Sequence, residues 1–273
     1  MLESFTRTPH AKSTHTWTLQ LHDPAIADAN TLGSVLADRI IELQCRGAPH
    51  LFIAWRSRAD GGGPLNIQTR LALEAFVAPA FGLPGSPAPL DHMEGFVAEH
   101  LWHALVLDGA AADGIVHLEP PSFRPTSPGG DGLVVHAHAG GGFSFRLWEL
   151  KKCTGQQTVS GTISSAYRQL DASAAKYLAE YTAVGQRLDN PDLASFFSQL
   201  VELWLRSDAR AAAGVAVHTS VVNLPGGQCF TTFGRRFPTF TNPVRLRGLV
   251  TAVDDFSAFA ELVRDRVWAG VTP

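Results

Sequence analysis

Residues 130–152 read GDGLVVHAHAGGGFSFRLWELKK, two apolar segments joined by three glycines, and the expected fold is built around them. Apolar and polar residues alternate on both sides of the glycines, which is typical of a β-hairpin. If Gly140–Gly142 form a three-residue loop, Asp131 lies opposite Lys151 on the paired strand. Because side chains alternate with a period of two, Glu149 shares their face. The pattern therefore places two acids and a lysine on the apolar face of the hairpin.

Charges on a core-facing surface cost free energy unless they pair or bind something. Two carboxylates from adjacent strands lie about 4.5–8 Å apart, and their oxygens are ligands that Mg²⁺ prefers. A neighbouring lysine can hold or deprotonate a water, or neutralise charge that develops on phosphorus. We therefore expect Asp131 and Glu149 to bind Mg²⁺, with Mn²⁺ as a substitute, and Lys151 to orient the water that cleaves a phosphodiester. The alternatives are an ordinary turn-forming Asp131 and a solvent-facing Glu149–Lys151 pair.

The hydrophobic pattern around the hairpin predicts an α/β protein. Residues 82–89, which are rich in Gly and Pro, separate an N-terminal region from the rest of the chain. Before this break we expect strands over 16–22 and 50–55, helices over 30–45 and 68–77, and a Gly-rich loop over 56–64. After it we expect helices over 91–107, with Asp91 as N-cap, and over 160–184, with strands over 114–118, 131–139, 143–152 and 214–222. Helical segments within 186–210, a strand over 245–253 and a helix over 256–268 complete the expected elements.

Composition and charge set limits on function. The chain has 273 residues, of which 45% are hydrophobic and 17% charged, as in a soluble globular protein. No run approaches the roughly 20 apolar residues of a membrane-spanning helix. The N-terminal Met1–Phe5 carries an acid where a secretory signal has basic residues, so we expect a cytoplasmic protein with no membrane partner. Three cysteines without a C-x-x-C pattern predict neither a disulfide framework nor a four-thiolate zinc site.

The hairpin motif resembles that of the PD-(D/E)XK nucleases. Asp131 is followed after seventeen residues by Glu149-Leu150-Lys151, and the expected order of helix, three strands, helix and strand is similar to the core of that superfamily. The resemblance implies a restriction-endonuclease-like αβββαβ core with a mixed central sheet flanked by helices, over residues 91–222, and α/β elaborations at both ends. It implies a nuclease-like domain over 87–273 with residues 1–86 as a lead-in packed on it.

The same resemblance implies roles for individual residues. Asp131 and Glu149 would ligate the metal, Lys151 would serve the water, and Glu99, or less well Glu94, would be an additional metal-binding acid on the preceding helix. Gln169 on the following helix would be an accessory residue. Two features depart from the family pattern: Pro128 stands three residues before Asp131, and Tyr177 stands eight residues after Gln169.

Other residues carry weaker signals. His136 and His138 fall on the hairpin face away from the carboxylates, and His100 and His103 lack complementary zinc ligands. Cys229, in a Gly-rich stretch, has no identifiable histidine partner. The net charge of −3 gives no overall attraction to nucleic acid, so contact would depend on local cations. We name Lys152, Arg235 and Arg236 as candidates, although solvated surface charges are an equal alternative.

The sequence contains no Walker, G-x-S-x-G or G-x-G-x-x-G motif placed after a strand. An α/β lead-in followed by nuclease motifs is similar to the nuclease subunits of Hachiman-type anti-phage systems, which work with a helicase. That resemblance implies a metal-dependent DNA endonuclease with a helicase or ATPase partner. The alternatives are a catalytically inactive adaptor of the same fold and a nuclease of DNA repair or transposition.

Overall fold

The computed structural model describes residues 1–122 and 131–272, so Pro128 and Gly130 of the sequence motif lie outside the described residues. The strands are β1 (Phe5–Ala11), β2 (Thr16–His22), β3 (Gly82–Leu83), β4 (Ser86–Pro87), β5 (Ile115–Leu118), β6 (Gly132–Ala137), β7 (Phe143–Cys153), β8 (Ala211–Ser220) and β9 (Leu246–Val253). The helices are α1 (Ala29–Gln44), α2 (Pro49–Ala59), α3 (Ile67–Phe81), α4 (Leu90–Gly109), α5 (Val159–Gly185), α6 (Pro191–Phe197), α7 (Leu200–Leu205), α8 (Phe233–Arg236) and α9 (Phe256–Ala269).

A mixed seven-stranded sheet in the order β1-β2-β9-β8-β7-β6-β5 forms the centre of the protein. Strands β2, β9, β8 and β7 are parallel, whereas β1, β6 and β5 pair antiparallel with their neighbours. Strands β7 and β8 are joined through α5, α6 and α7, and the antiparallel β6–β7 pair is the predicted hairpin. The chain is therefore α/β with a mixed sheet flanked by helices.

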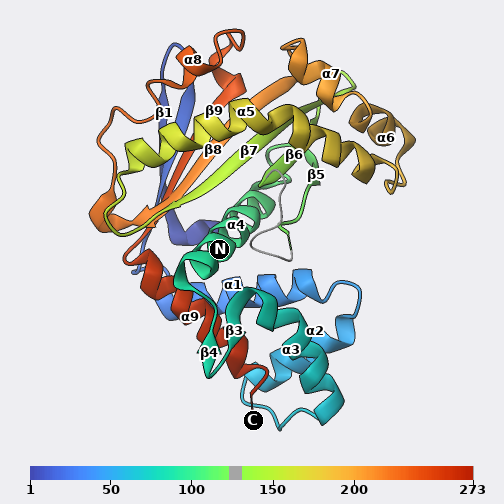
Figure 1. Cartoon of the computed structure of the whole chain (residues 1–273), viewed down its shortest axis with the longest axis vertical. Helices are drawn as coiled ribbons and strands as arrows, with labels where there is room; N and C mark the ends of the chain where they lie inside the picture. The colour runs from blue at the N-terminus through green and yellow to red at the C-terminus, as the bar shows by residue number, and fades with distance from the viewer. Residues whose placement is uncertain (123–130, 273) are drawn as a thin grey trace.

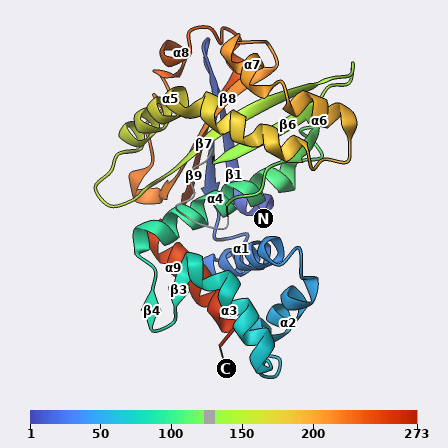
Figure 2. The ribbon, with the colours of Figure 1, turned by 45° about the vertical axis from the view of Figure 1, so that its right-hand side comes forward.

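Helices cover both faces of this sheet (Figures 1 and 2). Helix α5 lies across one face and packs on an apolar layer that includes Leu133, Phe145 and Leu147. Helix α4 packs on the other face, where Trp102 contacts the cluster that includes Trp148. A second core lies below the sheet, where α1, α2, α3 and α9 gather around the N-terminal half of α4. Helix α4 therefore connects the sheet to the helical part of the molecule.

Most predicted elements are present, including the order α4, β5, β6, β7, α5 and β8, with the short α6 and α7 before β8. The predicted strand over 50–55 is wrong, because this segment is the first part of α2. Pro49 stands at the start of that helix, and its buried residues, Leu51 and Trp55, follow a four-residue helical spacing. Strand β1 was not predicted, since it is an exposed edge strand interrupted by Pro9.

Two local predictions about helix α4 and the hairpin also need correction. The side chain of Asp91 does not cap α4, because Pro89 is the N-cap and Asp91 lies in the first turn. The hairpin pairs Ala137 with Phe143, so its connection is longer than Gly140–Gly142 and the register differs from the predicted one by two residues. An even shift preserves the alternation of faces.

No helix within residues 1–122 and 131–272 has the length and hydrophobicity needed to cross a bilayer.

Candidate active site

The site lies where β6 and β7 stop pairing. The last β6–β7 pair is Gly132 with Trp148, while β7 continues to Cys153 and stays paired with β8. Asp131 directly precedes β6, and its Oδ2 accepts a hydrogen bond of 2.7 Å from the backbone N–H of Leu150. This hydrogen bond holds the Asp131 carboxylate against the free edge of β7.

Glu149 and Lys151 share one face of β7, as their spacing predicts. Lys151 Nζ lies 2.7 Å from Glu149 Oε1; the Glu149 side chain is fully buried, whereas that of Lys151 is 29% exposed. This contact is a short ion pair, and the Asp131 carboxyl also lies beside the Glu149 carboxyl. Lys151 therefore stands at the mouth of the site and Glu149 at its base.

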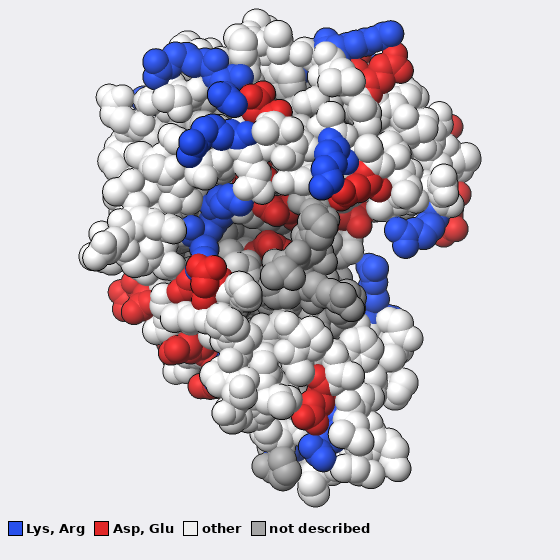
Figure 3. Space-filling view, in the orientation of Figure 1, with Lys and Arg blue, Asp and Glu red and all other residues white. Residues whose placement is uncertain are grey.

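Glu99 approaches the same site from α4. Its carboxyl interacts electrostatically with those of Asp131 and Glu149 and with the Lys151 ammonium. Three acids and one lysine thus gather at one point. Glu99 comes from α4, Glu149 and Lys151 from β7, and Asp131 from the position before β6. Figure 3 shows acidic side chains in a hollow on this side of the molecule, with basic side chains beside them.

Burial is the main cause that raises the pKa of all three carboxyls. The like charge of Asp131 raises the pKa of Glu99 and Glu149 further, while Lys151 opposes the shift in each case. For Asp131, the Leu150 hydrogen bond also opposes it. Burial and mutual repulsion therefore disfavour the fully ionised cluster, and an added cation would favour it.

Lys151 responds in the opposite way to its surroundings. Burial by itself lowers its pKa, but the Glu149 and Asp131 carboxylates outweigh burial and the net shift is upward. The ammonium therefore stays protonated at neutral pH, which suits a side chain that donates hydrogen bonds and stabilises negative charge rather than one that removes a proton.

Helix α5 adds aromatic hydroxyls beside this cluster. Gln169 Nε2 donates a hydrogen bond of 3.2 Å to the Tyr177 hydroxyl, and Tyr177 interacts electrostatically with Lys151. Burial and then the nearby carboxyls, including Asp131 and Glu99, raise the pKa of Tyr181. Sequence reasoning overlooked Tyr181, although it continues the four-residue spacing of Gln169, Ser173 and Tyr177 along the helix.

Glu94 and Lys152 lie in a separate network. Lys152 Nζ forms ion pairs with Asp91, at 2.5 Å, and with Glu94. Glu94 also accepts hydrogen bonds of 3.0 Å from Thr154 and 2.5 Å from Ser257. This buried network ties α4 to the end of β7 and the start of α9. It occupies the Glu94 carboxylate and the Lys152 ammonium, so the structure brings Glu99 rather than Glu94 to the acidic cluster.

Two open hollows flank the N-terminal half of α5. One, of about 420 Å³, runs from Lys151 past Thr158 to Ser165, and the other, of about 440 Å³, lies between Arg168 and Arg235. Arg236 borders the second hollow and forms an ion pair of 2.7 Å with Asp171. Basic side chains therefore follow the surface of α5 away from Lys151.

The weaker sequence signals have structural explanations. His100 Nδ1 lies at hydrogen-bond distance, 2.9 Å, from the accepting Phe96 carbonyl, and burial lowers the pKa of His100 to about 3 and of His103 to about 4. Burial raises the pKa of the Cys229 thiol to about 11, which disfavours a thiolate nucleophile. His136 lies on the sheet face away from the acids, as its parity predicts, and lines a different cavity.

The donor chemistry of the cluster fits a hard divalent cation. Asp131, Glu149 and Glu99 supply only carboxylate oxygens, and the Glu149 carboxylate among them is fully buried. Within residues 1–122 and 131–272, no three His, Cys, Asp or Glu side chains are already converged as metal ligands.

The chain matches no protein-family model, and no curated protein matches it.

Proposed function

We propose that this protein is a Mg²⁺-dependent nuclease of the PD-(D/E)XK type that hydrolyses phosphodiester bonds in DNA. One observation carries the proposal: the Asp131, Glu149 and Lys151 side chains gather where β6 and β7 separate, with Glu99 entering from α4. The order α4–β5–β6–β7–α5–β8 supports the restriction-endonuclease-like core, because it supplies both helices that flank such a site.

Each residue has a role that its surroundings support. Asp131, Glu149 and Glu99 would hold Mg²⁺, which when bound supplies charge stabilisation to the scissile phosphate. Lys151, charged and partly exposed, would orient the attacking water and stabilise negative charge on phosphorus. Gln169 would fix the Tyr177 hydroxyl beside the Lys151 ammonium.

The surface around the site offers a path for a phosphate backbone. Hollows lined by Thr158, Ser165, Arg168 and Arg235 extend from Lys151 along α5. Backbone N–H groups, hydroxyl groups and basic side chains bind the phosphates of a nucleic acid, and such contacts position it without recognising its base sequence. In this proposal Arg235 and Arg236 contact the phosphates, whereas Lys152 stabilises the fold through Asp91 and Glu94.

The proposal extends to the setting in which the nuclease works. The sequence has no Walker motif, so any ATP-driven opening or translocation of DNA would come from a helicase partner. We propose accordingly that the protein is the nuclease component of an anti-phage defence system of the Hachiman type. A nuclease of this kind, with negative net charge, would depend on its partner for much of its attraction to DNA.

The decisive experiment is cleavage of supercoiled, linear duplex and single-stranded DNA with Mg²⁺ or Mn²⁺. Wild-type protein is compared with Lys151→Ala and Asp131→Asn. The control variants are Lys176→Ala and Asp192→Asn, which remove an exposed lysine and an exposed acid elsewhere. We expect cutting that requires the metal and falls by at least about 100-fold in both site variants, with both controls active.

If the folded wild type does not cut, calorimetry with Mn²⁺ separates the two remaining explanations. Binding that Asp131→Asn and Glu149→Gln remove indicates a nuclease that needs its partner, and the assay is then repeated with a helicase of the same defence system. Absence of Mn²⁺ binding would identify a catalytically inactive protein of the same fold and refute the proposal.

A further inference from the structure

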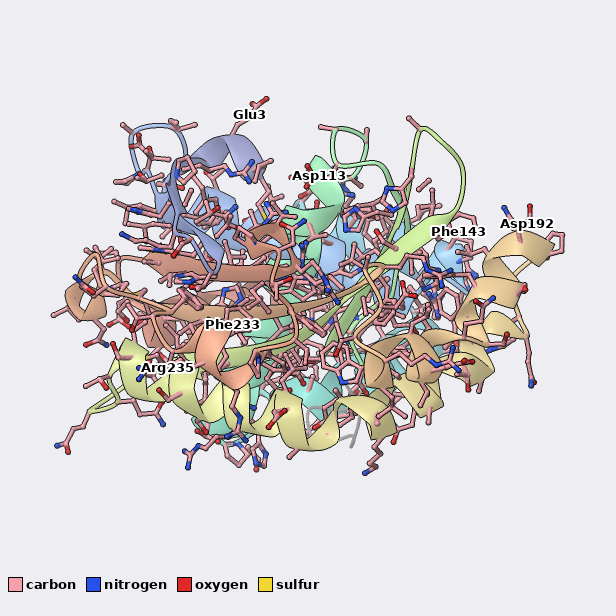
Figure 4. The ribbon with its side chains drawn as sticks, turned by 90° about the horizontal axis from the view of Figure 1, so that it is seen from above. Glu3, Asp113, Phe143, Asp192, Phe233 and Arg235 are labelled. Carbon is pink, nitrogen blue, oxygen red and sulfur yellow. The ribbon has the colours of Figure 1, made fainter. Side chains whose placement is uncertain are left out.

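A partly enclosed cavity of about 200 Å³ lies on the sheet face opposite α5. Its walls come from α4, from the segment before β5 and from β1, β6, β7 and β9. In Figure 4, Asp113, which lines the cavity, lies on one side of the sheet, and Phe233 and Arg235 lie on the other. The cavity is therefore distinct from the acidic cluster and from the hollows along α5.

Three arginines line this cavity together with two acids. Arg146 of β7, Arg247 of β9 and Arg7 of β1 all contribute to its wall, and the acids are Asp108 and Asp113. Asp108 is already paired with the N-terminal ammonium of Met1 and with Arg39. Burial lowers the pKa of Arg146 and of Arg247, and each guanidinium is also disfavoured by a neighbouring one, while Asp113 only partly compensates. None of the three guanidiniums forms an ion pair with a described residue. The three guanidiniums outnumber the two acids, one of which is paired elsewhere, and this excess of positive charge favours an anion.

Hydrogen-bond donors in the wall are also left without partners. Arg146 donates through Nη2 to the Val244 carbonyl at 2.6 Å, but its buried Nε has no acceptor among the described residues. Trp102 is fully buried, and its Nε1 likewise has no acceptor there. Buried donors without acceptors are costly, so the wall of this cavity carries polar groups that the described residues do not satisfy.

Much of the remaining wall is apolar, with Gln20 and His136 as further polar residues. The Trp148 indole lies close over Gly214 of β8, where an added Cβ would come within 2.3 Å of the ring. The Arg146 guanidinium stands 5.8 Å from the centre of the same ring. Trp102, Leu105 and Leu249 extend the apolar surface beside the arginines. Apolar walls with a few convergent polar groups are typical of sites for small organic ligands.

We propose that this cavity binds a small organic anion that combines a phosphate group with a flat ring, of the class of the nucleoside monophosphates. The arginines would take the phosphate, because guanidinium groups match its geometry through paired hydrogen bonds. The ring would lie against the tryptophan side of the cavity. The site is independent of the proposed nuclease function, since the acidic cluster faces the other way and repels anions.

Equilibrium binding of AMP, GMP, CMP and UMP, with inorganic phosphate as a separate probe, tests the proposal. The titrations use the full chain with EDTA, so that no metal can bridge a phosphate to the carboxylates. Intrinsic fluorescence reports the tryptophans, and calorimetry provides the dissociation constant. Arg247→Gln is the main variant. Arg7→Gln is the second variant, and because Arg7 lies on the exposed strand β1, this substitution leaves the protein interior unchanged. Arg206→Gln, on the surface away from the cavity, and Lys151→Ala are the controls.

We expect at least one monophosphate to bind more tightly than inorganic phosphate. Arg247→Gln and Arg7→Gln should each weaken it by about tenfold, whereas both controls should bind like wild type. Without ligand, the Arg247→Gln variant should unfold at the same temperature as wild type or at a higher one, because the substitution removes one of several like charges. If Arg247 served only to stabilise the fold, the variant would unfold at a lower temperature than wild type. Three outcomes would overturn the proposal: absence of binding, binding by both arginine variants as tight as that of wild type, or loss of binding in Lys151→Ala. Phosphate binding as tight as that of every monophosphate would overturn the role of the ring.

Discussion

The Glu149 side chain is fully buried. Lys151, itself partly exposed, is the cation beside it, while the Asp131 and Glu99 carboxyls add like charge. Burying an acid in this way costs free energy that the ion pair offsets only in part. A side chain that destabilises the fold and yet lies at the centre of a charged cluster is typical of a functional position.

Replacing Glu149 with Gln should therefore stabilise the metal-free protein. The amide keeps the shape and removes the buried charge, so we expect the free energy of unfolding to rise by about 1–3 kcal/mol, measured by urea unfolding with EDTA at pH 8. The exposed Glu180→Gln on α5 is the control and should change it by less than about 0.5 kcal/mol. A lower free energy in Glu149→Gln would show that the ion pair with Lys151 outweighs the cost of burial.

His218 has a buried ring on β8, and neither ring nitrogen has a partner among the described residues. Burial lowers its pKa to about 3. Below the ordinary histidine pKa of about 6.5, the unfolded chain binds a proton that the folded chain does not. His218 therefore reduces stability as the pH falls from that value toward 3.

We expect His218→Leu to be more stable than wild type, by an amount that grows by about 2 kcal/mol between pH 7 and pH 5. Urea unfolding at both pH values measures the change, and the exposed His50→Gln serves as the control. A difference between wild type and His218→Leu that is the same at both pH values would mean that this ring is not kept neutral by burial.

Among the elements, the central strand β8 is buried along its whole length and leaves no room at Gly214. The Trp148 ring of β7 lies where a side chain of residue 214 would extend. This close contact gives the sheet a flat aromatic surface under the arginine-lined cavity. It makes the position intolerant of even one methyl group.

Gly214→Ala should accordingly lower the free energy of unfolding by about 1–3 kcal/mol, because Trp148 must leave its position. Chemical denaturation provides the value, and near-ultraviolet circular dichroism reports the movement of the indole. Gly226→Ala, in a loop with no atom within 4 Å of an added Cβ, is the matched control. Equal stability of the two variants would contradict the close packing described here.

Over the molecule as a whole, three groups of charged side chains lie on different surfaces. The acidic cluster opens between α4 and α5, basic side chains follow α5 toward Arg235, and a third group of arginines faces the opposite side of the sheet. Helix α4 and strand β7 contribute to both the acidic cluster and the arginine-lined cavity. Glu99 and Trp102 stand one helical turn apart, and Trp148 and Glu149 are neighbours on opposite faces.

On the proposed function, DNA binding should depend on Arg235. Its substitution by Gln should weaken binding severalfold for every sequence and reduce the slope of log K against log salt by about one. Fluorescence anisotropy at several salt concentrations, with catalytically impaired Lys151→Ala as the parent, measures both quantities. Arg206→Gln in the same parent controls for net charge. An unchanged salt slope for Arg235→Gln would place the DNA elsewhere.

Local periodicity was enough to predict much of the fold. The alternation in β7 places Glu149 and Lys151 on one face whatever the hairpin register, which is why a two-residue error left the prediction of faces intact. Segment 50–55 was assigned wrongly because a short apolar run suits a strand as well as a helix. The roles assigned to Asp131, Glu149 and Lys151 remain predictions that the proposed assays test.

The sequence alone was enough to predict the α/β class, the order of elements from α4 to β8 and the shared face of the hairpin acids. These features depend on patterns between residues that are close in the chain. The packing of α4 against β7 was needed to show that Glu99 reaches the acidic cluster while Glu94 binds Lys152 and Ser257. The sheet order was needed to bring Arg7, Arg146 and Arg247 around one cavity. These contacts join residues far apart in the chain, and helix and strand periodicity contain no information about which elements meet.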